Sequence, residues 1–159
     1  MDLPPAQDRP DVRIPPPLIF FAFLGIAGLL EYGAGLNWPK GPVGLRSPLA
    51  LIVFIFSGYL ALHAFVVIKK RGSYIDTNKP TTQIVEDGPF KLSRNPMYLS
   101  LILVLFGFAV LLLSFWFLIA AAALWLVFDR LAVAPEETYL EHKFGERYTA
   151  YKTRVRRWI

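Results

Sequence analysis

Residues 97–128 read MYLSLILVLFGFAVLLLSFWFLIAAAALWLVF and contain no charged side chain. At about 1.5 Å per residue, one straight helix of this length would measure about 48 Å, well beyond the roughly 30 Å hydrocarbon core of a bilayer. With residues 129–133 added, the run divides better into two helices, 97–113 and 115–133, that turn near Ser114. Each arm is then close to the lower length limit of a membrane span. We therefore predict a membrane-embedded helical hairpin.

Two earlier apolar runs, 17–36 and 48–68, have the length of a membrane span. The first is interrupted only by Glu31, and the second contains one ionisable residue, His63. Across its 159 residues the chain is 55% hydrophobic, with a mean hydropathy of +0.43. We expect an all-α integral membrane protein with four membrane-embedded helices, a single domain over 17–159 and a flexible arm over 1–16.

Basic residues are distributed unequally among the connecting segments. The 37–47 loop contains only Lys40 and Arg46, whereas residues 69–96 and the tail 134–159 are rich in Lys and Arg. By the positive-inside rule, the basic loop and the tail lie on the cytoplasmic side. Four crossings then place both termini in the cytoplasm, which agrees with Arg9 and Arg13 before the first span.

Composition also excludes several functions. The chain has no cysteine, which rules out disulfides, cysteine nucleophiles and cysteine metal sites. A net charge of +5 without any nucleic-acid motif is better explained by binding to anionic lipid than by binding to nucleic acid.

Two ionisable residues lie within the first two apolar runs. No second histidine lies near His63, so we expect a packed or hydrogen-bonded histidine and no metal site. We expect Glu31 to reach the outer headgroups.

The segment Arg94-Asn95-Pro96-Met97-Tyr98 precedes the charge-free run directly. Asn95 suits an N-cap and Pro96 the first helical position, so the segment can be explained as a helix start alone. The same start offers free N–H groups and a partial positive charge to a carboxylate. Arg94 would stand beside that seat as a cation, and Tyr98 lies one turn into the helix.

The tail contains an adjacent pair of carboxylates, Glu136 and Glu137, after Pro135. An apolar stripe at helical spacing follows: Leu140, Phe144, Tyr148, Tyr151, Val155 and Trp158. This pattern predicts a cytoplasmic amphipathic helix that lies on the inner leaflet and is bent or broken at Gly145. Carboxylates are disfavoured beside anionic lipid, so the pair is better explained by a cationic or hydroxyl-rich ligand.

Together, the two segments resemble the isoprenylcysteine carboxyl methyltransferase family and the related phospholipid methyltransferases. That family has an Arg-His-Pro-x-Tyr-type motif before a membrane hairpin, a Glu-Glu pair after it and a similar C-terminal pattern. The resemblance covers residues 77–159. Asn95 stands where the family more often has His, and Ser100 where Gly is common.

The resemblance implies methyl transfer from S-adenosylmethionine to a lipid-like or amphiphilic acceptor carrying a carboxylate or amine. The helix start at Asn95, Pro96, Met97 and Tyr98 would meet the cofactor carboxylate. Glu136 and Glu137 would meet its ammonium, sulfonium and ribose groups. Arg94 or Arg130 would hold an anionic acceptor. The residues expected to enclose the adenine are Tyr98, Leu140, Phe144, Tyr148 and Tyr151.

Two other functions remain open from the residues. An NADPH-dependent membrane sterol or isoprenoid reductase would have a similar C-terminal helical region, although its phosphate-rich cofactor calls for more arginine. A non-catalytic membrane adaptor would use the basic tail, including Arg154, Arg156 and Arg157, to bind anionic lipid or a partner. The sequence leaves the methyl acceptor and the oligomeric state undefined.

Overall fold

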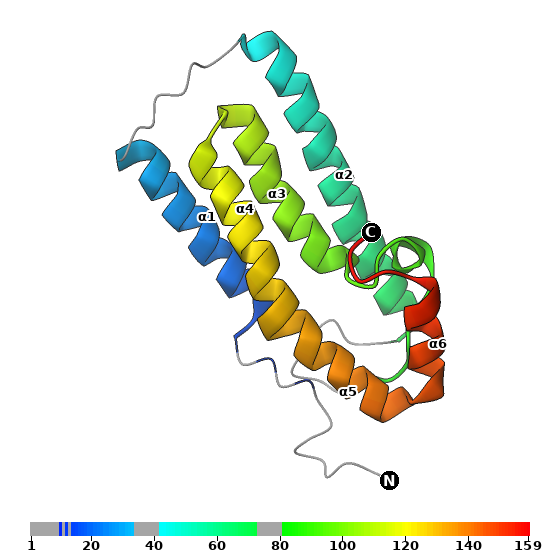
Figure 1. Cartoon of the computed structure of the whole chain (residues 1–159). Helices are drawn as coiled ribbons and strands as arrows, with labels where there is room; N and C mark the ends of the chain where they lie inside the picture. Colours follow the sequence, from blue (N-terminus) through cyan, green and yellow to red (C-terminus); the bar gives the residue numbers. More distant parts are fainter. Residues whose placement is uncertain (1–9, 11, 13, 34–41, 73–80) are drawn as a thin grey trace.

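The computed structural model describes residues 10, 12, 14–33, 42–72 and 81–159, and these residues form helices and connecting segments without a strand (Figure 1). Four helices form a bundle: α1 (Pro16–Gly33), α2 (Val43–Lys70), α3 (Pro96–Leu112) and α4 (Phe115–Phe128). The predicted arm over 1–16 lies mostly outside the described residues, and its last residue, Pro16, begins α1. Of the predicted loop over 37–47, residues 37–41 are outside the described residues and residues 43–47 belong to α2.

Three helical stretches of the described chain are long and apolar enough to cross a membrane: Pro16–Gly33, Val43–Lys70 and Phe115–Phe144. Helix α3 is apolar but, at 17 residues, shorter. The helices begin and end within a few residues of the predicted bounds, with two exceptions. Helix α2 starts at Val43 instead of 48, and α4 ends at Phe128 instead of 133, because a π-helical turn follows it. The described residues are thus helical, and three of their helical stretches are long and apolar enough to span a membrane.

The predicted hairpin turn is confirmed at Leu113 and Ser114. Leu113 ends α3 in the left-handed conformation with φ 48°, and Ser114 is the N-cap of α4. The Ser114 hydroxyl accepts a hydrogen bond from Phe117 N–H at 3.2 Å and donates one to the carboxylate of Glu31. Glu31 therefore ties α1 to the hairpin instead of only reaching toward headgroups.

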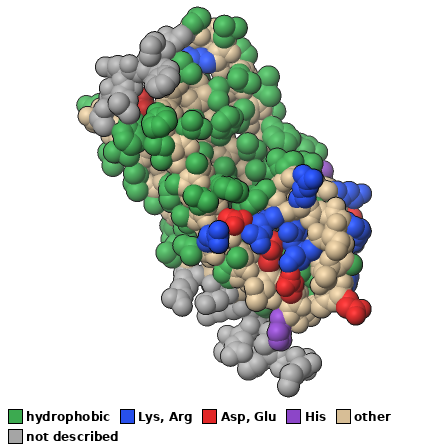
Figure 2. All heavy atoms as spheres, viewed as in Figure 1, with side chains coloured by type: hydrophobic (Ala, Val, Ile, Leu, Met, Phe, Trp, Pro, Cys, Tyr) green, Lys and Arg blue, Asp and Glu red, His purple; other side chains and the backbone are tan. Residues whose placement is uncertain are grey.

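Helix α2 packs along α3, and α1 packs along α4 (Figure 1). At the first interface the Ser57 hydroxyl donates to the Ser100 carbonyl at 2.8 Å, and Phe54 covers Gly107. Side chains such as Leu105, Leu124 and Phe128 fill the centre of the bundle. In Figure 2, apolar side chains cover most of the visible face of the bundle, as expected of a surface that faces lipid, whereas charged side chains gather on the lower part of the molecule.

The helical backbone continues beyond Phe128, where both α4 and the charge-free run end. A π-helical turn (η2, Asp129–Val133) leads directly into α5 (Ala134–Phe144). Pro135 explains this turn, because proline has no N–H for an α-helical bond and its ring crowds the preceding turn. The predicted boundary at 133/134 is thus a change of helix type inside one continuous helical stretch.

Gly145, with φ 53°, breaks the tail helix as predicted, and α6 (Glu146–Arg154) turns back toward the bundle. The predicted position of the apolar stripe on the inner leaflet is wrong. Tyr148 and Tyr151 are buried with Ile84, and the partly buried Leu140, Phe144 and Val155 pack around them. The stripe covers the segment before the short 3₁₀ turn η1 (Gly88–Lys91), since that segment supplies an apolar partner within the protein.

Candidate functional site

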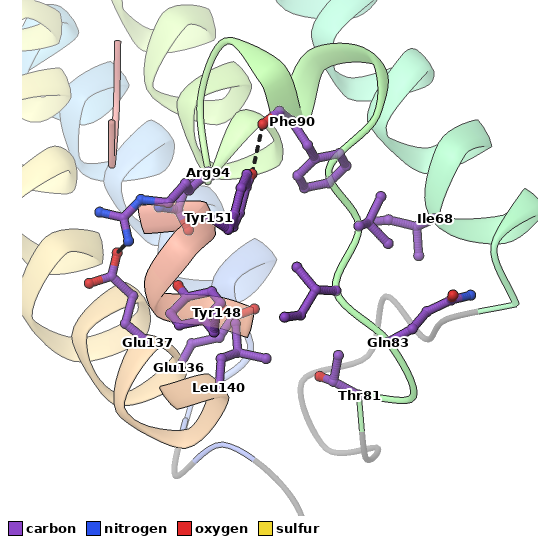
Figure 3. A pocket seen from close by; sticks show the side chains of 13 residues that line it. Ile68, Thr81, Gln83, Phe90, Arg94, Glu136, Glu137, Leu140, Tyr148 and Tyr151 are labelled. Carbon is purple, nitrogen blue, oxygen red and sulfur yellow. Dashed lines mark hydrogen bonds and ion pairs between the residues drawn. The ribbon is translucent and has the colours of Figure 1, made fainter. Parts of the chain in front are cut away.

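A cleft opens where α5 and α6 face the end of α2 and the segment that leads into α3 (Figure 3). Its volume is about 610 Å³, including the part open to solvent. The lining residues are Ile68, Thr81, Gln83, Ile84, Val85, Phe90, Arg94, Asn95, Glu136, Glu137, Leu140, Tyr148 and Tyr151.

Four charged side chains of alternating sign form a chain beside and within this cleft. Arg157 contacts Asp129 through Nη1 at 3.0 Å, and it contacts both carboxylate oxygens of Glu137, at 3.2 and 2.6 Å. Arg94 Nη1 lies 2.9 Å from Glu137 Oε1 on the other side. Each charge therefore has an opposite charge next to it, the arrangement that makes buried ions tolerable.

Arg94 retains hydrogen-bonding capacity despite its ion pair. Its side chain is only 9% exposed, and its buried Nε and Nη1 atoms form no hydrogen bond with any residue that the structure describes, although Nη1 is close to Glu137. The 2.9 Å contact is an ion pair that does not meet the geometry of a hydrogen bond. Buried donors without a partner are costly, so a ligand that accepts from them would be favoured here.

Glu136 is the second carboxylate of the lining, and it has a different environment from Glu137. Its Oε2 accepts a hydrogen bond from the Tyr98 hydroxyl at 3.0 Å, and no Lys or Arg of the described residues forms an ion pair with it. Among the lining residues Arg94 is the one cation, against two carboxylates. The cleft is therefore suited to a ligand that carries positive charge next to a carboxylate. No group of described His, Asp or Glu residues has the arrangement of a metal site.

Two tyrosines form the wall opposite the α2 end of the cleft. Tyr151 donates to the Phe90 carbonyl at 2.7 Å and so connects α6 to the η1 turn (Figure 3). Burial, followed by the negative charge of Glu137, raises the pKa of Tyr148. Burial, followed by the neighbouring Tyr148, also raises the pKa of Tyr151. Both phenols therefore remain neutral and offer flat, largely apolar surfaces.

Residues 155–158 pair with the segment that leads into α3. Arg94 N–H donates to the Arg156 carbonyl at 3.1 Å. The Arg157 carbonyl accepts from Asn95 Nδ2 at 3.0 Å and from the Ser93 hydroxyl at 3.2 Å. Asn95 occupies the N-cap position as predicted, but its side chain makes no capping bond, because it is engaged with Arg157. A ring N–H of histidine, common in the resembled family, can donate in the same way.

Comparison with known proteins identifies the family of this chain. A family profile described as phospholipid methyltransferase matches residues 45–147. The chain belongs to the phospholipid methyltransferase family. An uncharacterized protein of Haemophilus influenzae (strain ATCC 51907 / DSM 11121 / KW20 / Rd) is 43% identical over 63 residues, 40% of this chain and 100% of the relative. No solved structure matches.

Membership of the phospholipid methyltransferase family indicates a membrane methyltransferase, in agreement with the three long apolar helices. It also confirms the resemblance inferred from the sequence motifs. The matched residues include Arg94, Asn95, Glu136 and Glu137, whereas Tyr148, Tyr151 and Arg157 lie beyond them. The family match therefore includes every charged residue of the cleft lining.

Most of the site residues predicted from sequence meet at the cleft of this phospholipid methyltransferase family member. Those that line it are Arg94, Asn95, Glu136, Glu137, Leu140, Tyr148 and Tyr151. Tyr98 reaches the cleft indirectly, through its bond to Glu136, and Phe144 packs behind the tyrosines. Pro96 is buried at the helix start, and Met97 lies outside the lining. Arg130 is also outside the lining, with a side chain 79% exposed and 3.8 Å from Asp129.

Sequence reasoning missed two groups of residues. The first is the stretch before η1, which contributes Thr81, Gln83, Ile84 and Val85 to the lining and has no distinctive pattern in the sequence. The second is Arg157, which the sequence analysis assigned to lipid attraction together with Arg154 and Arg156. Arg157 instead contacts Asp129 and Glu137. It follows α6 on non-helical backbone, so helical spacing could not have assigned it to the carboxylates.

Proposed function

We propose that this protein is a membrane-embedded methyltransferase that uses S-adenosylmethionine and acts on a lipid-like or amphiphilic acceptor carrying a carboxylate or amine. One observation carries the proposal. One cleft holds Glu136, a carboxylate without a cationic partner among the described residues, together with Arg94, whose Nε and Nη1 form no hydrogen bond within the described part of the chain. S-adenosylmethionine carries the complementary groups, a carboxylate beside an ammonium and a sulfonium.

The other lining residues also suit this ligand. Glu136 would hold the positively charged part, and Arg94 the carboxylate, through charge-assisted hydrogen bonds. Tyr148, Tyr151 and Leu140 supply aromatic and apolar surface for the adenine. NADPH, which carries several phosphate charges, fits less well, because the lining contains more carboxylates than cations.

When bound, S-adenosylmethionine supplies a methyl group that its positively charged sulfur has already activated. The protein side chains therefore need to do little acid–base work, and their main tasks are orientation and the exclusion of water. The buried, mutually paired charges around Glu137 are suited to orientation, because their partners restrict their motion. The tyrosine wall and Leu140 exclude water from one side of the cleft.

The setting of the cleft supports an acceptor with an apolar part. Ile68 belongs to the long apolar helix α2 and lines the cleft, so apolar surface continues from the bundle into the site. We place the cleft and both termini on the cytoplasmic side, on the basis of the basic segments 69–96 and 134–159. Membrane lipid would then surround the bundle, and the acceptor would reach the cleft from the cytoplasmic leaflet.

Calorimetry on the purified protein in neutral detergent tests the proposal. S-adenosylmethionine and S-adenosylhomocysteine are expected to bind, and NADPH is not. Glu136→Gln should weaken S-adenosylmethionine binding about ten- to a hundredfold, the value of a charge-assisted hydrogen bond. The matched control is Glu141→Gln on the same helix, since Glu141 pairs with Lys152 and does not line the cleft.

Two results would contradict the proposal. One is binding of NADPH without either adenosyl compound, which would favour a reductase. The other is the absence of binding by all three compounds while the protein still associates with anionic vesicles, which would favour an adaptor. Equal effects of Glu136→Gln and Glu141→Gln would remove Glu136 from the site.

A further inference from the structure

Arg157 contacts the charges of the cleft without lining the cleft itself. Its guanidinium lies between two carboxylates, with Asp129 on one side and Glu137 on the other. Asp129 also accepts a hydrogen bond from Trp158 Nε1 at 3.0 Å, so the next residue strengthens the same anchor. Arg157 is therefore held by two carboxylates and lies outside the lining of the cleft.

The two arginines that contact Glu137 do so in different ways. Arg157 uses Nε and Nη2 to reach both carboxylate oxygens, at 3.2 and 2.6 Å, which is the fork geometry of a strong arginine–carboxylate pair. Arg94 makes one contact with Glu137, at 2.9 Å to Oε1, and its Nε and Nη1 form no hydrogen bond among the described residues. Glu137 thus directs its hydrogen-bonding capacity mainly to Arg157.

Hydrogen bonds to the main-chain carbonyls of Arg156 and Arg157 hold the two arginines in these positions. The carbonyl of Arg157 accepts from Asn95 and Ser93, the two neighbours of Arg94 in sequence. Arg94 itself donates its N–H to the Arg156 carbonyl. Both arginines are consequently held relative to each other by backbone as well as by Glu137.

We propose that Arg157 is a positioning residue that occupies Glu137 and so keeps the donors of Arg94 available for the carboxylate of the cofactor. The inference rests on the proposed function, because it assumes S-adenosylmethionine as the ligand. Without Arg157, Glu137 would be free to turn both oxygens toward Arg94. Arg94 would then be neutralised by a carboxylate of the protein, which competes with that of the ligand.

The test compares the affinities of S-adenosylmethionine and decarboxylated S-adenosylmethionine, which keeps the amine and the sulfonium but lacks the carboxylate. The ratio of their dissociation constants reports the carboxylate contact alone. Partial unfolding of a variant weakens both ligands equally and leaves the ratio unchanged. In the wild-type protein we expect S-adenosylmethionine to bind about ten- to a hundredfold more tightly.

Arg157→Ala should bring this ratio close to one, with little change for the decarboxylated compound. Adding Glu137→Gln to Arg157→Ala should restore most of the ratio, because the competing charge is removed. Arg156→Ala is the matched control, as it removes one exposed positive charge from the adjacent residue and keeps the carbonyl that Arg94 uses. It should leave the ratio unchanged.

Arg157→Lys provides a second variant if Arg157→Ala does not fold. Lysine keeps the charge but cannot form the fork, so the ratio should fall between that of wild type and one. A wild-type ratio in both Arg157 variants, or no recovery with Glu137→Gln, would overturn the positioning role and leave the proposed function standing. If the wild-type protein binds neither compound, both the proposed function and this inference are wrong.

Discussion

The apolar bundle α1–α4 and the polar head, residues 81–95 and 129–159, are stabilised in different ways. In the bundle, small and apolar side chains pack along neighbouring helices, with a few polar links such as Ser57 to Ser100. In the head, segments far apart in sequence are joined by ion pairs and hydrogen bonds, as between Arg157 and Glu137. Many sequences can satisfy the first arrangement. The second depends on particular pairs, and removing one partner leaves a buried charge.

The largest expected effect concerns topology. The head and the opposite end of the bundle should lie on different sides of the membrane. A reporter fused after Ile159 should be cytoplasmic, and one inserted within 37–47 should be external. The expectation follows from the excess of Lys and Arg in the segments of the head. Protease protection and reporter activity in intact cells measure it. Finding both reporters on one side would refute the four-crossing arrangement.

Within the head, Glu137→Ala should cause the largest loss of stability. The side chain is 7% exposed and lies between two arginines, so its removal leaves both without their shared carboxylate. A broken buried pair costs about 3–5 kcal/mol. Chemical unfolding in detergent measures the loss. Glu141→Ala, which removes a more exposed pair with Lys152, should cost under about 1 kcal/mol. Similar losses for both variants would mean that burial of the head charges does not matter.

In the bundle, the corresponding test is Gly107→Ala on α3. A Cβ at this position would lie 2.5 Å from Phe54 Cε1, and Phe54 is itself packed against Phe108. Overpacking of this kind costs about 1–3 kcal/mol. The control, Gly58→Ala on α2, meets no atom within 4 Å and should be neutral or slightly stabilising. Thermal unfolding compares the two variants. Equal melting temperatures would show that the α2–α3 interface accommodates the extra methyl group without loss of stability.

The smallest expected effect is an alkaline one and belongs to the head. Burial raises the pKa of Tyr148 and Tyr151 above the ordinary value of about 10, so the folded state keeps protons that the unfolded state releases. Stability from these groups is complete below about pH 10 and falls as the pH rises further. Tyr148→Phe should reduce that fall, measured as melting temperature between pH 9 and 11. The same slope in both proteins would contradict the shift at Tyr148.

Much of the fold was predictable, because in lipid every backbone polar group must be satisfied within the protein. Long runs without charge therefore have to be helices, and their lengths gave the helix bounds closely. The hairpin turn near Ser114 was predictable because the run is too long for one span, whereas the capping role of Ser114 emerged from the structure. The π turn before Pro135 and the early start of α2 were not predictable, since local crowding and packing determine them.

The candidate site was only partly predictable. The resemblance to the methyltransferase family implied that Arg94, Glu136 and the two tyrosines share one site, and the structure brings them to one cleft. The same argument treated Glu136 and Glu137 alike, yet one accepts from a tyrosine and the other pairs with two arginines. Composition and periodicity were enough for membrane helices and a basic face, and the family resemblance implied the residues of a cofactor site. The partners of each charged side chain depend on the path of the chain after Gly145. Only the tertiary packing of α6 and residues 155–158 determined which charges form ion pairs, because these contacts join segments far apart in sequence.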